Sequence, residues 1–256
     1  MKENVDPQQD FTDQALRIIH EAEKQGVVLR LMGAIAVRLQ CPNFANLHRE
    51  MGRVITDIDF VGYEKQTQKI EKVLESLDYI GRPMSYSFIM LGRLIFTHKT
   101  SGRHVDVFLN KLAMCHTIDY KKRLEIDNLT VPLAELLLQK MQIVQLSEKD
   151  VIDIMIMFLE HKIGDEDTNM INIAYIADLM SKDWGFYYTM TTNLNKVKSL
   201  VGEFPALSEQ QKQIVVGKAD QILAALEAVP KSRSWKLRAR IGPSKKWYKD
   251  IYSAPK

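Results

Sequence analysis

With 256 residues, 46% of them hydrophobic, the chain is long enough to bury a substantial core as one large domain or two modest ones. Its two cysteines, Cys41 and Cys115, lie far apart, which excludes a disulfide framework and a CxxC metal site and favours a reducing compartment. No apolar run approaches the roughly 18 residues of a membrane-spanning helix, and the start MKENVDPQQD is unlike a signal peptide, so we expect a cytoplasmic protein with no membrane partner.

The net charge of +3 is unevenly distributed along the chain. Residues 231–256 contain nine Lys or Arg and a single acid, Asp250. Subtracting these from the totals of 35 basic and 32 acidic residues leaves 26 basic and 31 acidic residues in positions 1–230. An acidic body with a strongly basic end is therefore expected.

The first half of the chain alternates predicted helices and strands. Asp10 can cap a first helix and Gly26 can end it, with apolar side chains recurring at helical spacing between them. The strand patterns RLIFTH and RHVDVFL flank four residues that include Gly102 and predict a hairpin. The predicted elements are a helix at 10–26, a strand at 27–31, a helix at 34–40, a polar loop at 42–53, a strand at 55–62, a helix at 65–78, and strands at 93–98 and 103–109.

From about residue 125 onward the patterns are helical. Pro132 is suited to a helix start, and Ser147 with Asp150 resembles a capping box. Helices are predicted at 132–144, 148–162, 168–181, 186–200 and 208–228, the last capped by Ser208. The expected fold class is α+β: a small mixed sheet flanked by helices in residues 1–128, a helical domain in residues 129–230, and a basic, aromatic tail in residues 231–256.

Three aspartates predict a metal site. Asp57 and Asp59 are two positions apart in a predicted strand, so their carboxylates should point to the same face. Asp106 stands in the apolar strand HVDVFL, where a carboxylate is costly unless it is paired or coordinated. If the two strands are neighbours, the three carboxylates converge and can hold two Mg²⁺ ions. A solvated strand edge for the first pair, and an ion pair with Arg103 for Asp106, are the structural alternatives.

A candidate phosphate site precedes the three aspartates in the chain. The strand LRLM runs into Gly33 and Ala34 at a predicted helix start, where free backbone N–H groups and the helix dipole favour an anion. A simple turn between strand and helix would give the same pattern.

Taken in order, these motifs resemble the polymerase-β-like nucleotidyltransferase superfamily, whose pattern is a Gly-Gly or Gly-Ser turn, a D-x-D strand and a third carboxylate on a later strand. The resemblance implies that Gly33 and Ala34 bind the triphosphate of a nucleotide. It also implies that Asp57, Asp59 and Asp106 bind two Mg²⁺ ions. Ala34 departs from the family's Ser or Gly, which removes a hydroxyl contact to phosphate.

Within the superfamily, residues 28–160 are similar to the abortive-infection (AbiEii-like) and toxin-type nucleotidyltransferases. Arg53 and Thr56 match the family's R-x-T-x-D-x-D, except that Thr56 directly precedes the first aspartate. The leucine-rich helix LAELLLQKM and the later EKDVIDI match a second motif. Through it, the resemblance implies that Lys140 and Asp150, together with Asp153, belong to the active site. It further implies an RNA acceptor such as a tRNA end, and an antitoxin-like protein partner.

The position of Lys140 indicates independently that it has an anionic partner. It lies within the apolar stripe of its helix, four residues after Leu136. A buried ammonium group needs an anion or a wet cleft. A nucleotide phosphate and a structural carboxylate such as Asp150 both satisfy this need.

The basic tail interleaves cations with aromatic residues, a composition that suits phosphate neutralisation and base stacking. A basic arm that packs across the acidic body would have the same composition. The candidate nucleic-acid-binding residues are Arg233, Trp235, Lys236, Arg238, Arg240, Lys245, Lys246 and Trp247.

The sequence therefore predicts a metal-dependent nucleotidyltransferase that transfers a nucleotidyl group from a nucleoside triphosphate to a hydroxyl acceptor, with an RNA end as one candidate. A protein or small-molecule hydroxyl is the alternative acceptor. A non-catalytic module that binds nucleotide or RNA is the alternative without chemistry.

Overall fold

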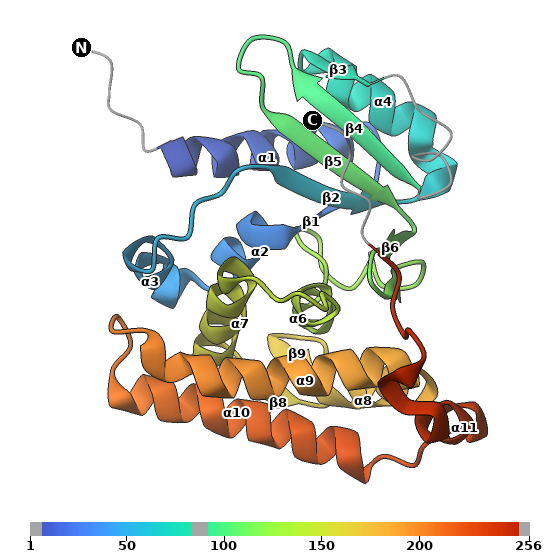
Figure 1. Ribbon diagram of the computed structural model, residues 1–256. Coiled ribbons are helices and arrows are strands. Elements are labelled where there is room, and N and C mark those ends of the chain that lie inside the picture. Colours follow the sequence, from blue (N-terminus) through green and yellow to red (C-terminus); the bar gives the residue numbers. More distant parts are fainter. Residues whose placement is uncertain (1–6, 83–91, 251–256) are drawn as a thin grey trace. The chain divides into compact units, whose positions relative to one another are not determined.

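The structure, a computed structural model, describes residues 7–82 and 92–250 (Figure 1). The chain divides into two compact units. The first comprises residues 1–39, 54–112 and 119–132, and the second comprises residues 40–53, 113–118 and 133–256. The domain boundary expected at 128/129 compares with a last change of unit at 132/133, and each unit is made of three separate segments of the chain.

The first unit is built on a five-stranded mixed sheet in the order β1-β2-β5-β4-β3. β2 and β5 run parallel, whereas the pairs β1–β2, β4–β5 and β3–β4 are antiparallel. The predicted hairpin is confirmed as β4 and β5. The strands are β1 (Leu29–Met32), β2 (Ile58–Gly62), β3 (Tyr79–Gly81), β4 (Arg93–His98) and β5 (His104–Leu109).

Helices cover one face of this sheet. The covering helices are α1 (Pro7–Lys24) and α4 (Thr67–Ser76). A third, short helix, α2 (Gly33–Gln40), directly follows β1 in the chain. A Cβ added at Gly62 would lie 3.0 Å from Ile70 Cδ1 of α4. The side chains that alternate onto this covered face, such as Ile58 and Phe60, are fully buried. Asp59, between them, therefore lies on the opposite face.

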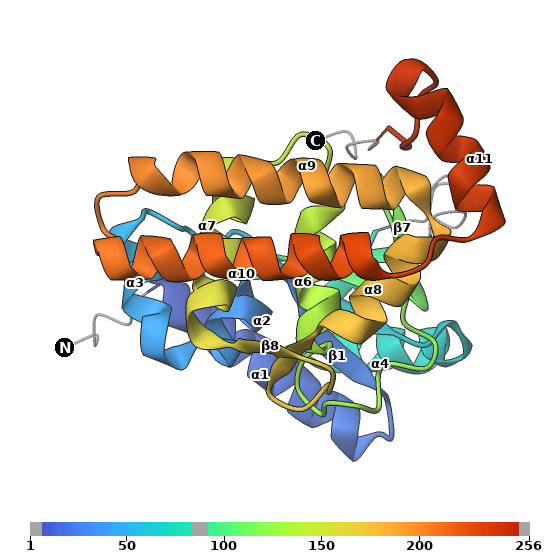
Figure 2. The ribbon, with the colours of Figure 1, turned by 90° about the horizontal axis from the view of Figure 1, so that it is seen from below.

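The second unit is helical, and α7 (Glu148–Glu160) is its core, with every residue from Val151 to Leu159 buried. The predicted cap is confirmed, because Ser147 Oγ accepts a hydrogen bond from the Asp150 N–H. Figure 2 shows the two longest helices of this unit, α9 and α10, running side by side. The other helices are α3 (Ala45–Glu50), α6 (Leu133–Met141), α8 (Ile173–Lys182), α9 (Trp184–Leu200), α10 (Glu209–Ala228) and α11 (Arg233–Ile241).

Several local elements differ from expectation. The predicted polar loop at 42–53 is wrong in part, because it contains a 3₁₀ turn (Pro42–Phe44) and α3, both packed on α7. Strand β3 of the main sheet was not predicted, and neither were β8 (Lys162–Gly164) and β9 (Met170–Asn172), which pair in parallel. The helix predicted at 168–181 is wrong at its start, because β9 occupies 170–172 and α8 begins at Ile173. A small sheet of β6 (Lys111–Ala113) and β7 (Thr117–Asp119) forms where the chain leaves and re-enters the first unit. The α+β class is confirmed.

None of the helices in the described ranges combines the length and the apolar character that a membrane crossing requires.

Candidate functional site

Asp59 and Asp106 lie directly opposite each other in the first unit. β2 and β5 are in parallel register, and Asp59 pairs with Asp106. Residues opposite each other in register share a face of the sheet, so both carboxylates lie on the face turned away from α4. The sheet thus brings two acids together that are far apart in sequence.

Asp57 is placed differently from the expectation. β2 begins at Ile58, so Asp57 precedes the strand, and its side chain is exposed. Thr56, also exposed, donates a hydrogen bond of 3.4 Å from Oγ1 to Asp57 Oδ1. Within residues 7–82 and 92–250, no group of three or more His, Cys, Asp or Glu side chains is arranged to hold a metal ion. The register of β2 and β5 therefore places Asp59 and Asp106, two of the three predicted metal ligands, side by side.

Arg93 on β4 makes an ion pair with Asp106, with 2.5 Å between Nη2 and Oδ2. The second carboxylate oxygen, Oδ1, is buried and has no hydrogen-bond partner within the described part of the chain. A buried acceptor without a partner is costly, and carboxylate oxygens are the ligands that Mg²⁺ prefers. The chemistry of Asp59 and Asp106 therefore fits a divalent cation.

Gly33 is the first residue of α2 and lies against the Asp59 carboxylate. A Cβ at this position would be 2.5 Å from Asp59 Oδ2, and the backbone φ of +72° is one that side chains rarely adopt. Ala34 follows in the first turn and is buried. The predicted Gly-Ala turn thus touches the acid pair, and only glycine allows this approach.

We expect Gly33→Ala to damage both stability and the acid pair. Gly26→Ala is the matched control, because Gly26 has φ +65° with nothing within 4 Å of an added Cβ. The control should lose only the backbone strain of about 1–2 kcal/mol. Gly33→Ala should lose more in chemical denaturation, and also metal affinity, because the methyl group displaces Asp59. Equal losses in the two variants would contradict the close contact.

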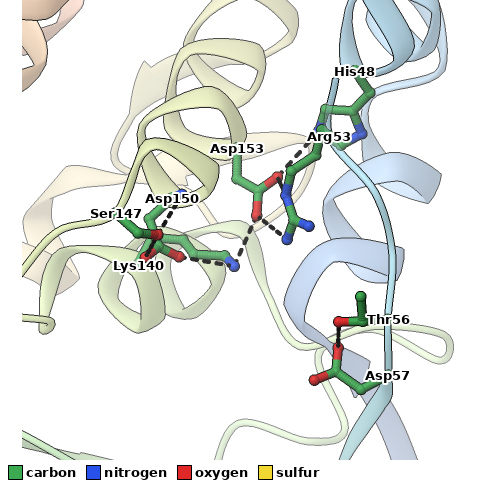
Figure 3. A network of polar contacts seen from close by, with 8 residues as sticks. All are labelled: His48, Arg53, Thr56, Asp57, Lys140, Ser147, Asp150 and Asp153. Carbon is green, nitrogen blue, oxygen red and sulfur yellow. Dashed lines mark hydrogen bonds and ion pairs between the residues drawn. The ribbon is translucent and has the colours of Figure 1, made fainter. Parts of the chain in front are cut away.

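A second cluster of charges lies in the helical unit (Figure 3). Asp153, fully buried on α7, accepts two hydrogen bonds from Arg53, from Nε to Oδ1 at 2.9 Å and from Nη2 to Oδ2 at 3.0 Å. Lys140 Nζ of α6 lies 2.8 Å from Asp153 Oδ2 and 3.4 Å from Asp150 Oδ1. His48 Nε2 lies 3.2 Å from Asp153 Oδ1 but lacks the alignment of a hydrogen bond. Three predicted residues, Arg53, Lys140 and Asp150, thus meet around Asp153.

In this cluster, the groups of opposite charge stabilise each other's charged forms. Burial alone would raise the pKa of Asp153, but the Lys140 ammonium and the Arg53 guanidinium hold it well below its ordinary value. Burial alone would lower the pKa of Lys140, but the Asp153 and Asp150 carboxylates outweigh this effect and raise it. In this structure the anionic partner of Lys140 is a pair of carboxylates, the structural one of the two options that the sequence left open.

Two residues that contact the predicted acids, Arg93 and His48, were not identified from the sequence. Arg93 was missed, although the predicted hairpin already places it near Asp106: Ile95 pairs with Asp106, and Arg93 two residues earlier shares that sheet face. His48 was missed because its segment was assigned to a loop, and no local pattern links it to α7.

The basic tail packs on the second unit through its aromatic residues. Trp235 makes an edge contact with Tyr187, and Trp247 Nε1 donates to Thr189 Oγ1 at 3.0 Å. The Arg238 guanidinium lies 4.4 Å from the centre of the Trp184 ring. These three candidate residues therefore serve packing. The predicted nucleic-acid-binding residues that remain exposed are Arg233, Lys236, Arg240, Lys245 and Lys246.

No protein-family model and no curated protein matches this chain. Two solved structures are similar at a low level. The antibiotic-resistance factor ANT(2'')-Ia is 11% identical, covering 86% of this chain and 96% of its own, with a TM-score of 0.38. An antigenic nucleotidyltransferase-like protein from Paracoccidioides brasiliensis is 13% identical, covering 88% and 96%, with the same TM-score. Similarity at this level establishes neither a shared fold nor a shared activity.

Proposed function

We propose that the chain is a metal-dependent nucleotidyltransferase of the polymerase-β-like type, similar to the toxin-type enzymes. The observation that carries the proposal is the parallel pairing of Asp59 with Asp106. Oδ1 of Asp106 is buried and finds no hydrogen-bond partner among the residues that the structure describes. Gly33 lies against Asp59 at the start of a helix, where a triphosphate can be received by backbone N–H groups.

In the proposed reaction, an acceptor hydroxyl attacks the α-phosphorus of a nucleoside triphosphate. The new bond joins the acceptor oxygen to that phosphorus, the bond to the β-phosphate oxygen breaks, and pyrophosphate leaves. Two Mg²⁺ ions, held by Asp59, Asp106 and the exposed Asp57, would supply charge stabilisation for the attacking and leaving oxygens. Asp106 would accept the proton of the attacking hydroxyl. Gly33 and Ala34 would orient the phosphates through their N–H groups.

Arg53, Thr56, Lys140 and Asp150 enter the proposal through the family resemblance, as nucleotide-binding or catalytic residues. The geometry adds that Asp153 holds Arg53 and Lys140 in place, because it contacts both cations. Asp153 is accordingly proposed as a positioning residue.

RNA is the acceptor class that we propose first. The exposed cations Arg233, Lys236 and Arg240 on α11 support it, since phosphate contacts depend on accessible positive charge. Base stacking on Trp235 and Trp247 is not part of the proposal, because both rings are packed. A protein or small-molecule hydroxyl remains the alternative acceptor, and an antitoxin-like protein is a proposed partner.

The function is tested by measuring pyrophosphate release from each of the four ribonucleoside triphosphates, with Mg²⁺, with and without total tRNA. Wild type is compared with Asp57→Ala/Asp59→Ala and with the charge reversal Arg233→Glu/Lys236→Glu/Arg240→Glu. Release that requires the aspartates supports the transferase, and stimulation by tRNA that the charge reversal removes supports RNA. Triphosphate binding without release under every condition would favour the binding module instead.

A further inference from the structure

Arg93 is the first residue of β4, which lies between β5 and β3 in the sheet. It lies on the same sheet face as Asp59 and Asp106, and its guanidinium is 5.2 Å from the centre of the Phe108 ring. Only 26% of its side chain is exposed, and only 10% of the Asp106 side chain. The ion pair is therefore largely buried. A buried charge without a partner of opposite charge is costly.

The pair nevertheless leaves polar groups unsatisfied. Arg93 uses Nη2 for Asp106 Oδ2, while its Nε is buried and has no hydrogen-bond partner within the described residues. Asp106 Oδ1 is unsatisfied in the same way. An arginine that served Asp106 permanently would be expected to use both donors of its planar fork, as Arg53 does with Asp153. The contact with Arg93 balances the charge of Asp106 but leaves part of its hydrogen-bonding capacity unused.

We infer that Arg93 is the counter-cation of Asp106 when no metal is bound, and that a divalent ion displaces it. This inference rests on the proposed metal centre. Asp106 needs one positive partner in its buried setting, and a cation bound between Asp106 and Asp59 supplies that charge instead. Arg93 and the metal ion then compete for the same carboxylate, because two cations at one carboxylate repel each other. Arg93 sets the metal affinity of the site and is a positioning residue.

The test is Mn²⁺ binding followed by electron paramagnetic resonance, without nucleotide, in the full-length protein. Arg93→Met removes the charge and keeps a flexible apolar stem over Phe108, and we expect its Kd for Mn²⁺ to fall about tenfold. Its melting temperature in EDTA should decrease, because Asp106 is left buried without a counter-ion. Arg93→Lys keeps the charge and should bind Mn²⁺ nearly as wild type does.

Arg103→Met is the matched control. Arg103 makes a similar pair with Asp10 and lies 4.5 Å from the centre of the Phe11 ring, but it does not contact Asp106. Its Kd for Mn²⁺ should equal that of wild type. If Asp106→Asn abolishes binding while Arg93→Met leaves the affinity unchanged or weakens it, the inference is overturned and the metal centre stands. If Asp106→Asn binds Mn²⁺ as wild type does, the metal centre itself is overturned.

Discussion

Asp106→Asn is expected to lower the rate of pyrophosphate release by about 10³-fold or more. The amide keeps the shape of the side chain but loses the negative charge that would bind the metal and accept the proton. A loss of roughly 4 kcal/mol of transition-state stabilisation corresponds to this factor. The measurement is kcat/KM for release from the preferred triphosphate at saturating Mg²⁺.

Asp78→Asn is the control for that prediction. Asp78 is an exposed acid of the same unit, paired with Lys99, and its φ of +64° is one that asparagine tolerates. Its kcat/KM should stay within about twofold of wild type, since exposed pairs contribute little. Equal activity of Asp106→Asn and wild type would remove Asp106 from the reaction.

Asp153→Asn is expected to destabilise the protein by about 3–5 kcal/mol at pH 7, because it leaves two buried cations, Arg53 and Lys140, without their shared counter-ion. The measurement is the free energy of unfolding in urea. Asp178→Asn breaks an exposed pair with Lys182 on α8 and should cost less than about 1 kcal/mol. A cost below about 1 kcal/mol for Asp153→Asn would show that the network adds little to the fold.

The same residue gives a pH signature. The pKa of Asp153 lies well below 3.8 in the folded protein, since Lys140 and Arg53 outweigh the effect of burial. A carboxyl group with a lowered folded pKa adds stability above its unfolded pKa, and that stability is lost as the pH falls below it. Wild type should therefore lose more stability than Asp153→Asn between about pH 5 and pH 2. Parallel pH profiles of the two proteins would contradict this assignment.

The elements that were predicted correctly are those with local signals. The Ser147 cap of α7 depends on residues three positions apart, as does the predicted Ser208 cap of α10, which the structure extends to a capping box with Gln211. The β4–β5 hairpin follows from two strand patterns around a short turn. Neighbours along the chain decide such features, so one sequence is enough to find them.

Features that depend on distant partners could not be derived in this way. The segment at 42–53 has few apolar residues, and α3 forms because it packs on α7. Arg53 and Asp153 are separated by 100 positions, and no spacing rule connects them. Composition leaves two interpretations of the tail open, and Trp235 and Trp247 pack against Tyr187 and Thr189 of the second unit, contacts that no local pattern indicates.

The candidate site lies between these cases. The D-x-D pattern and the isolated aspartate pointed to Asp59 and Asp106, and the parallel register of β2 and β5 supplies the proximity that the sequence could only assume. The rule that alternate residues of a strand share a face does not apply to Asp57, because it lies one position before β2 begins. Arg93 shows that the register of a hairpin also contains information about which cation faces an acid.

The most direct test of the metal centre counts the Mn²⁺ ions bound per chain by electron paramagnetic resonance, in the presence of a triphosphate whose α,β-bridging oxygen is replaced by a methylene group. Two ions per chain are expected for wild type, with at least one lost in both Asp59→Asn and Asp106→Asn. The same number of ions, bound equally tightly, in wild type and both variants would show that these carboxylates are not metal ligands.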